Sequence, residues 1–156
     1  MEKVISPCNI RIDKEGVWYY KGNEIFRDEI VRFFYQNLKK DETGRYLIEL
    51  DDDCCYLEVE DTPFVVRAIY KLTAESDNEE CINLLLSDQS IEKLNPDSLW
   101  AAKDNVLYCS VKKNAFVARF SRASYYQIAE FIECSDGGDE YFISLNGKHF
   151  CITMAA

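Results

Sequence analysis

The pattern of hydrophobic and polar positions changes period along the chain, and each change predicts a different element. Residues 16–20 form a short aromatic run of the kind found in strands. Residues 26–38 place their apolar side chains at helical spacing, which predicts an amphipathic helix. Residues 45–50 and 55–59 alternate apolar and polar side chains around the acidic turn 51–53, which predicts a hairpin.

The middle of the chain is less regular. Pro63 breaks the preceding strand because proline cannot donate a hydrogen bond to a β-ladder. Residues 64–73 and 81–86 predict two further strands, which we expect to pair with each other. Residues 87–104 show no clear period and contain Pro96, so we expect a connecting loop there.

The order of elements in the first half recurs toward the C-terminus. Residues 105–120 predict a hairpin, and Ser121 is a good N-cap for a helix over residues 122–132. Residues 140–153 predict a last hairpin around the Asn146-Gly147 turn.

An offset of 95 residues aligns the two halves, with Arg27 on Arg122 and Tyr46 on Tyr141. We therefore expect an α+β protein of two repeated hairpin–helix–hairpin units that share a core. The N-terminal half would span residues 1–73 and the C-terminal half residues 74–156, packed as one compact unit. A cleft between two such halves would be a natural ligand site.

Composition limits the classes of partner. The 156 residues are 47% hydrophobic, which is enough for a sizeable core, and carry a net charge of −10. Because an acidic surface repels phosphate backbones and anionic lipids, we expect neither nucleic acid nor a membrane as partner. No segment is long and apolar enough to cross a bilayer, and residues 1–13 lack the apolar run of a signal peptide. We expect a cytoplasmic protein whose seven cysteines are free thiols.

Residues able to carry nucleophilic or metal chemistry are few. The single histidine, His149, stands beside a turn, where a solvated side chain is the alternative to a catalytic one. His149 and Cys151 share a strand face, but no CxxC or HxxxH spacing accompanies them, so we expect no metal site. The vicinal pair Cys54-Cys55 lacks a basic neighbour that would lower a thiol pKa.

Charged residues offer two better candidates. Glu60 and Asp61 stand at a strand break, where side chains can point into a cleft. Arg27 and Arg122 each open a predicted helix, and a helix N-terminus with an arginine fork can hold a phosphate or carboxylate. The alternative for each arginine is a surface ion pair. The sequence contains no GxGxxG or Walker motif that would support a standard nucleotide loop.

Four stretches carry a recognisable pattern, namely the run Gly16 to Arg27, residues 44–48, residues 59–64 and, near the second helix, residues 118–126. Together they resemble the DUF1285 family of uncharacterised bacterial proteins. The resemblance extends from about residue 8 to the C-terminus. It implies a duplicated α+β core with a second half similar to pleckstrin-homology-like folds. It also implies a binding site at the interface of the halves for a nucleotide-like ligand, and a role in signalling.

Taken together, these patterns favour a non-catalytic module that binds a small anionic or nucleotide-like ligand in the cleft between the halves, without a cofactor. A protein–protein interaction module with an exposed sheet edge or aromatic patch is the alternative. An enzyme is a third possibility, which would need Glu60 and Asp61 inside a closed pocket. The candidate ligand-binding residues are Trp18, Arg27, Tyr46, Glu60, Asp61, Phe64, Arg67, Arg119, Arg122 and Tyr125.

Overall fold

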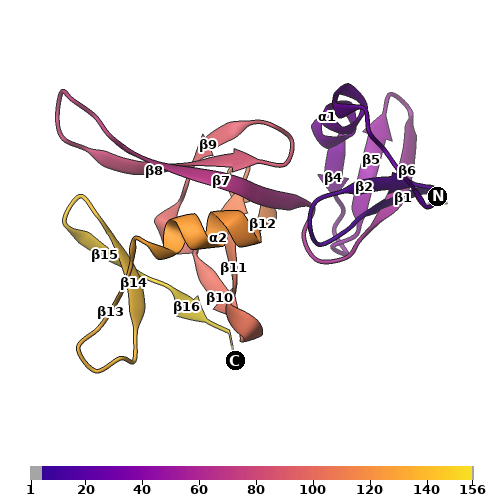
Figure 1. The fold of residues 1–156 in the computed structure, drawn as a ribbon. Coiled ribbons are helices and arrows are strands. Elements are labelled where there is room, and N and C mark those ends of the chain that lie inside the picture. The colour runs from indigo at the N-terminus through magenta and orange to yellow at the C-terminus, as the bar shows by residue number, and fades with distance from the viewer. Residues whose placement is uncertain (1–4, 156) are drawn as a thin grey trace. The chain divides into compact units, whose positions relative to one another are not determined.

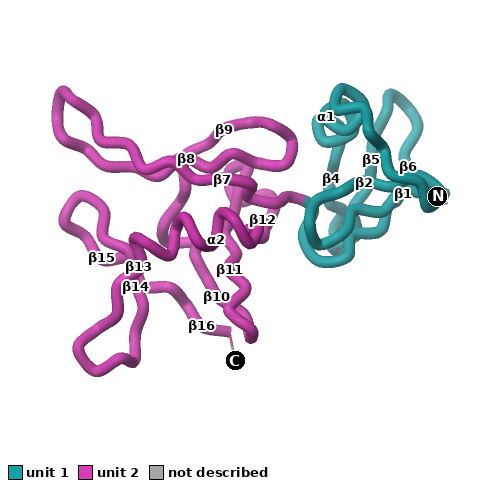
Figure 2. The backbone as a smooth tube through the Cα atoms, in the orientation of Figure 1, with its two compact units in different colours: residues 1–63 teal, residues 64–156 magenta. Residues whose placement is uncertain are grey.

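The structure, a computed structural model, describes residues 5–155. The chain divides into two compact units, unit 1 (residues 1–63) and unit 2 (residues 64–156), which are coloured separately in Figure 2. The boundary lies between Pro63 and Phe64, whereas the hydrophobic pattern places it ten residues later, after residue 73.

Unit 1 is a six-stranded sheet with one helix. Its elements are β1 (Ser6–Ile12), β2 (Trp18–Tyr20), β3 (Asn23–Glu24), α1 (Asp28–Gln36), β4 (Leu38–Lys40), β5 (Tyr46–Leu50) and β6 (Asp53–Val59). The strand order is β3-β2-β1-β6-β5-β4, and β1 pairs with β6 in parallel while the other neighbours are antiparallel (Figure 1). Because the parallel pair joins the first and last strands of the unit, this pairing forms only when the whole intervening segment has folded.

Aromatic packing holds α1 to this sheet. Trp18 on β2 is 1% exposed, and its ring lies 5.9 Å from that of Phe34 and 4.8 Å from that of Tyr35. The Tyr35 hydroxyl donates a hydrogen bond of 2.8 Å to the carbonyl of Pro63. These contacts bury the face of α1 that carries Phe34 and Tyr35, whereas Phe33, which the helical spacing places on the buried face, is 50% exposed.

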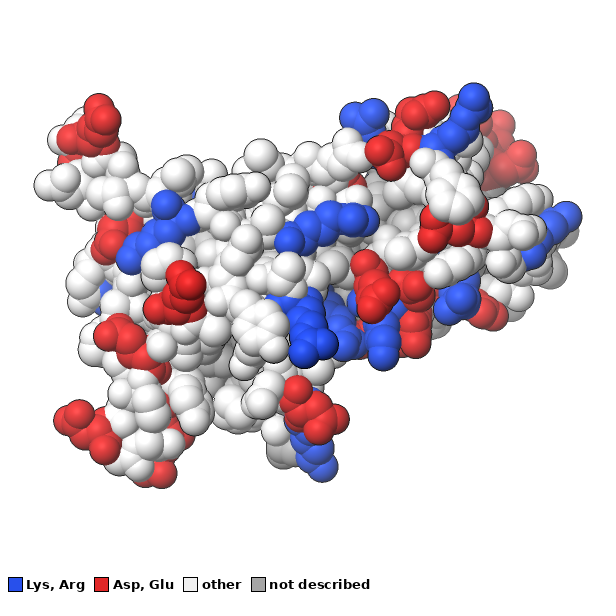
Figure 3. Space-filling model, viewed as in Figure 1, with Lys and Arg blue, Asp and Glu red and all other residues white. Residues whose placement is uncertain are grey.

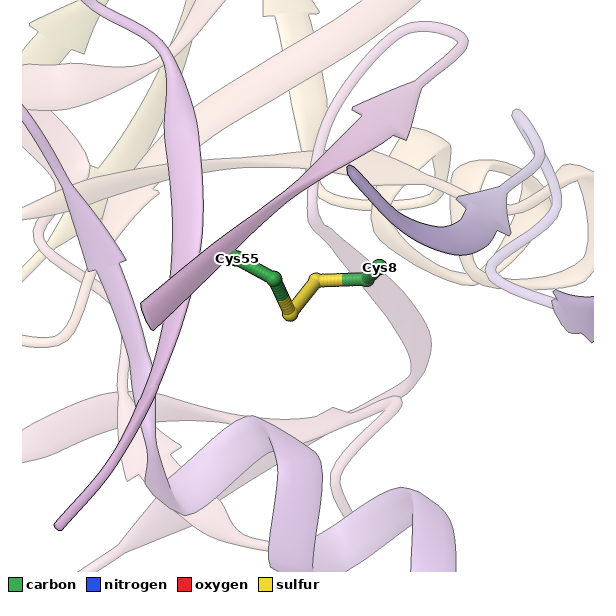
Figure 4. The surroundings of a disulfide bond; sticks show 2 residues. All are labelled: Cys8 and Cys55. Atoms are coloured by element: carbon green, nitrogen blue, oxygen red, sulfur yellow. A yellow bond between two sulfur atoms is a disulfide. The ribbon is translucent and has the colours of Figure 1, made fainter. Parts of the chain in front are cut away.

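A disulfide links Cys8 on β1 to Cys55 on β6, with 5.0 Å between their Cα atoms (Figure 4). The expectation of seven free thiols is therefore wrong for these two residues. They stand 47 positions apart, and only the parallel pairing of β1 with β6 brings them together. The remaining five cysteines are free.

Unit 2 contains a larger sheet and a smaller one. Its elements are β7 (Phe64–Thr73), β8 (Glu80–Leu86), β9 (Ile91–Lys93), the 3₁₀ helix η1 (Pro96–Ser98), β10 (Trp100–Ala102), the 3₁₀ helix η2 (Lys103–Asn105), β11 (Val106–Val111), β12 (Phe116–Phe120), α2 (Arg122–Ala129), β13 (Ile132–Cys134), β14 (Tyr141–Leu145), β15 (Lys148–Cys151) and β16 (Thr153–Met154). The larger sheet has the order β16-β10-β11-β12-β7-β8-β9, and the smaller one has the order β13-β14-β15.

Helix α2 lies against β7 and β12 of the larger sheet (Figure 1). Ser121 caps the helix, and its side chain accepts a hydrogen bond from the amide of Ser124, as expected from the sequence. The side chain of Ile128 on α2 is fully buried. The side-chain oxygen of Gln127 accepts a 2.8 Å hydrogen bond from the amide of Ile69 on β7. Along α2, the hydrogen bonds of Ser121 and Gln127 therefore accompany the buried apolar side chain of Ile128.

The fold confirms a mixed α+β protein and most of the expected elements. The hairpin of β5 and β6, the strand break at Pro63 and the pairing of β7 with β8 are as expected. The loop expected over residues 87–104 is wrong, because β9, η1, β10 and η2 lie within it. Short strands of three residues carry too little periodicity to be distinguished from loop.

In residues 5–155, no helix is long and apolar enough to cross a membrane.

We expect Ile128→Ala to lower the free energy of unfolding by about 2–5 kcal/mol, because it removes fully buried side-chain volume beneath α2. Tyr126→Ala on the exposed side of the same helix should change it by about 0.5 kcal/mol or less. Denaturant unfolding monitored by circular dichroism measures both. Equal effects for the two variants would contradict the burial of this helix face.

The Cys8–Cys55 disulfide predicts that the oxidised protein, unfolded in denaturant, shows five titratable thiols instead of seven, the seven cysteines less the bonded two. Cys8→Ser should lower the free energy of unfolding by about 2–4 kcal/mol, because the cross-link no longer restricts the unfolded chain. The same loss should appear in the wild type after addition of dithiothreitol, which should not affect the variant. Seven thiols in the oxidised protein would refute the bond.

Candidate functional site

The expected ligand-binding residues of unit 1 do not gather at one place. Trp18 is a core residue of the sheet. Arg27 is exposed at the start of α1, where its guanidinium lies 3.9 Å from the carboxylate of Glu29. Glu60 is exposed and accepts a hydrogen bond from the amide of Lys14. These three side chains therefore have separate local roles.

Tyr46 lies within electrostatic reach of Asp61. Burial, and then the nearby negative charge of Asp61, raise the pKa of the half-buried Tyr46 phenol above its ordinary value. The ammonium of Lys40 lies 5.8 Å from the centre of the Tyr46 ring. The phenol is thus held neutral beside a carboxylate.

Three arginines of unit 2 lie around the start of α2. Arg119 pairs with Val65 across β12 and β7, and Arg67 follows two residues later on β7. Arg122 is the first residue of α2, and its guanidinium lies 5.9 Å from the ring of Tyr126. The sequence predicts the helix start correctly, but only the register of β12 on β7 brings Arg67 to it.

Phe64, by contrast, is a core residue. It is 2% exposed, and its ring lies 5.3 Å from that of Phe116. Tyr125, the last of the expected residues, lies one helical turn beyond Arg122 and lines a pocket.

This pocket, called the α2 pocket below, has a volume of about 360 Å³ and belongs entirely to unit 2. It opens between α2, the β10 and β16 edge of the larger sheet, and the strands β13 and β14. Its walls are mainly apolar, formed by Ala101, Leu107, Tyr125, Ala129, Ile132, Tyr141, Ile152 and Met154. Such a volume matches the usual size of small-molecule sites.

The α2 pocket contains few polar groups. Asn105, Glu133 and Cys134 lie in its lining. The Glu133 carboxylate accepts a 2.9 Å hydrogen bond from the hydroxyl of Ser144 on the neighbouring strand. The register of β13 on β14 places the Glu133 side chain with Phe142 and Ser144, on the face opposite to Ile132, Cys134 and Tyr141.

Sequence reasoning identified one lining residue of the α2 pocket, Tyr125, and missed the rest. Leu107 and Ile152 read as ordinary core positions of strands and Ile132 as part of the predicted helix, although the structure places it on β13, and nothing in their spacing distinguishes a pocket wall from a core. The pocket forms from elements that are distant along the chain, so no local pattern identifies it.

The sulfur and imidazole side chains differ in accessibility. Burial raises the pKa of the Cys109 thiol to about 12, helped by the negative charge of Glu92. Cys134 and Cys151 are both exposed on the smaller sheet. The His149 ring stacks on that of Phe142 at 4.2 Å. Among residues 5–155, no group of three or more His, Cys, Asp or Glu side chains is placed to hold a metal ion.

Charges are mixed on the surface that Figure 3 presents. Basic and acidic side chains alternate there, and neither sign covers a continuous field. Recognition of a charged ligand would therefore depend on individual side chains.

Comparisons with known proteins confirm the resemblance expected from the motifs. Residues 3–62 match the family model described as domain of unknown function (DUF1285), N-terminal domain. A crystal structure of a DUF1285 family protein from Silicibacter pomeroyi DSS-3 is similar with a TM-score of 0.77 at 20% identity, covering 95% of this chain and 81% of that one. A second, from Shewanella baltica OS155, has a TM-score of 0.64 at 18% identity, covering 80% of this chain and 91% of that one. No curated protein matches the chain.

Proposed function

We propose that the protein is a non-catalytic module that binds a small nucleotide-like ligand, with the planar part of the ligand in the α2 pocket. The observation that carries this proposal is the pocket itself, with its apolar walls and few polar groups. The site lies within residues 64–156.

Each part of a nucleotide-like ligand has a partner in this proposal. The apolar walls and the rings of Tyr125 and Tyr141 suit a planar base. The anionic part would reach Arg122, which precedes Tyr125 by one helical turn.

The finer features of the fold belong to the same proposal. We infer an internal duplication, supported by the agreement of β5 (residues 46–50) with β14 (residues 141–145) at an offset of 95. We also infer a pleckstrin-homology-like second half, supported by a seven-stranded sheet with a packed helix. A cytoplasmic location and a role in signalling complete this proposal, and both follow from the composition and the family resemblance.

A second candidate is a protein-interaction module. Tyr70 and Leu72 on β7 and Ile91 on β9 are large apolar side chains with exposed fractions of 49%, 48% and 61%. The register of β7, β8 and β9 places all three on the same face of the sheet. This apolar face gives the second candidate a defined surface.

We expect one class of nucleotide or nucleoside to raise the thermal unfolding midpoint, because a ligand at about 100 times its Kd stabilises the fold by about 2.7 kcal/mol. Ala129→Leu should abolish the shift by filling the α2 pocket, whereas Ala123→Leu on the exposed side of the same helix should retain it. A nucleotide should shift the midpoint more than its uncharged nucleoside, and Arg122→Gln should remove that difference.

Thiol labelling tests the location independently of stability. Bound ligand should slow the alkylation of Cys134, which lines the α2 pocket, and leave that of Cys151 unchanged. A ligand that shifts the midpoint but protects neither thiol, and binds Ala129→Leu equally well, would place the site elsewhere. The absence of any shift across nucleotides and nucleosides would favour the interaction module.

A further inference from the structure

A second pocket lies within unit 1, between helix α1 and the sheet face against which this helix packs. It has a volume of about 440 Å³ and is called the α1 pocket below. Its walls are formed by Cys8, Ile10, Tyr20, Ile25, Ile30, Phe34, Ile48, Leu50 and Cys55. All of these residues belong to unit 1, so the α1 pocket shares no residue with the α2 pocket.

Strand register explains why these side chains meet on one face of the sheet. Ile10 on β1 pairs with Tyr20 on β2, and Ile48 on β5 pairs with Cys55 on β6. Tyr20 stands two residues after Trp18, whose ring stacks on α1, so both side chains point to the helix side of the sheet. Ile10 and Ile48 form the floor of the pocket, with exposed fractions of 6% and 1%.

The helix covers only part of this sheet face. It has nine residues, and its last turn packs Phe34 against Trp18. Ile30 lies one turn before Phe34 and is half-buried at the pocket wall. The disulfide between Cys8 and Cys55 joins β1 and β6 in the same wall. These covalent and aromatic contacts form the α1 pocket in advance, which lowers the cost of binding a ligand.

The chemistry of the walls selects an apolar ligand. Among residues 5–155, no charged side chain lines the pocket, and Tyr20 is the one wall residue with a hydroxyl group. An ionised group inside the pocket would lose water without gaining a partner of opposite charge. A hydrocarbon chain would instead gain free energy from every methylene that the walls cover.

Charges of both signs stand beside the pocket. The ammonium of Lys21 lies 5.4 Å from the centre of the Tyr20 ring. Asp53 pairs with Leu50 across β6 and β5, and its side chain is exposed. A charged head group of either sign would have one of these two as a like charge. An uncharged polar group at the mouth, such as a hydroxyl, avoids this repulsion.

We propose that the α1 pocket binds an uncharged molecule with a medium-length hydrocarbon chain, of the primary alcohol class. The chain lies on Ile10 and Ile48, and the hydroxyl stays in water at the mouth. This site goes beyond the function proposed above, which concerns unit 2, and either one can fail without the other.

The test is a titration of the full-length protein, labelled with ¹³C at the isoleucine δ1 methyl groups, with 1-butanol, 1-hexanol and 1-octanol. We expect saturable shifts of the methyl resonances of Ile10, Ile30 and Ile48, and no shift of Ile82 in the core of unit 2. The Kd should fall about fourfold for each added methylene, which is the gain expected from its burial. Octanoate and octylamine should bind more weakly than 1-octanol.

Ile30→Trp should raise the Kd for 1-octanol by about tenfold or more, because the indole ring would displace at least two methylenes of the chain. Leu50→Trp, which fills the pocket from the sheet side, should have the same effect. Gln36→Trp at an exposed position of α1 is the matched control and should leave the Kd unchanged. The methyl resonance of Ile12, fully buried in unit 1, should stay at its wild-type position when a variant is folded.

A Kd that does not depend on chain length would overturn the assignment of a hydrocarbon ligand. Tighter binding of octanoate or octylamine than of 1-octanol would overturn the uncharged head group and identify Lys21 or Asp53 as its partner. The site itself would be overturned by shifts of unit 2 resonances alone, by the absence of saturation through the millimolar range of 1-octanol, or by equal weakening in Ile30→Trp and Gln36→Trp.

Discussion

One backbone carbonyl, that of Val66 on β7, holds the arrangement on which unit 2 depends. It accepts a 3.0 Å hydrogen bond from the amide of Ser121 and a 2.7 Å bond from the hydroxyl of Ser124. Ser124 is fully buried, and its hydroxyl also lies 3.1 Å from the Ser121 carbonyl and accepts a 3.0 Å hydrogen bond from the Ser121 hydroxyl, so the buried polar groups at this point satisfy one another. The contact joins the end of β12, the start of α2 and the strand β7 at one point. The wall of the α2 pocket formed by Tyr125 and Ala129 follows directly from it.

Unit 1 uses a different constraint, because its first and last strands must meet in parallel. The pairing of β1 with β6 sets the strand order and brings Cys8 to Cys55. The inner face of the same sheet packs its aromatic side chains against α1. This packed face and the disulfide therefore stabilise the same sheet.

Local patterns in the sequence predict the local parts of this structure. The hairpin of β5 and β6 follows from alternation, and the start of α2 follows from Ser121 as a cap, because both depend on neighbouring residues. The parallel pairing of β1 with β6 and the disulfide depend on residues 47 positions apart, and no local period reports such a contact. The candidate sites show the same limit. Tyr125 could be selected as an aromatic residue on a helix, whereas Leu107 and Ile152 become pocket walls only through contacts between elements distant along the chain.

The Val66 carbonyl fixes α2 and with it the pocket wall, and amide hydrogen exchange of Ser124→Ala tests this contact most directly. We expect the amides of Tyr125, Ile128 and Ala129 to exchange faster in this variant, because α2 opens more often when its buried hydroxyl contact is lost. The amides of β5 in unit 1 serve as the internal reference and should keep their rates. Unchanged exchange along α2 in the variant would contradict the claim, and the pocket wall would then have to be held by its apolar contacts alone.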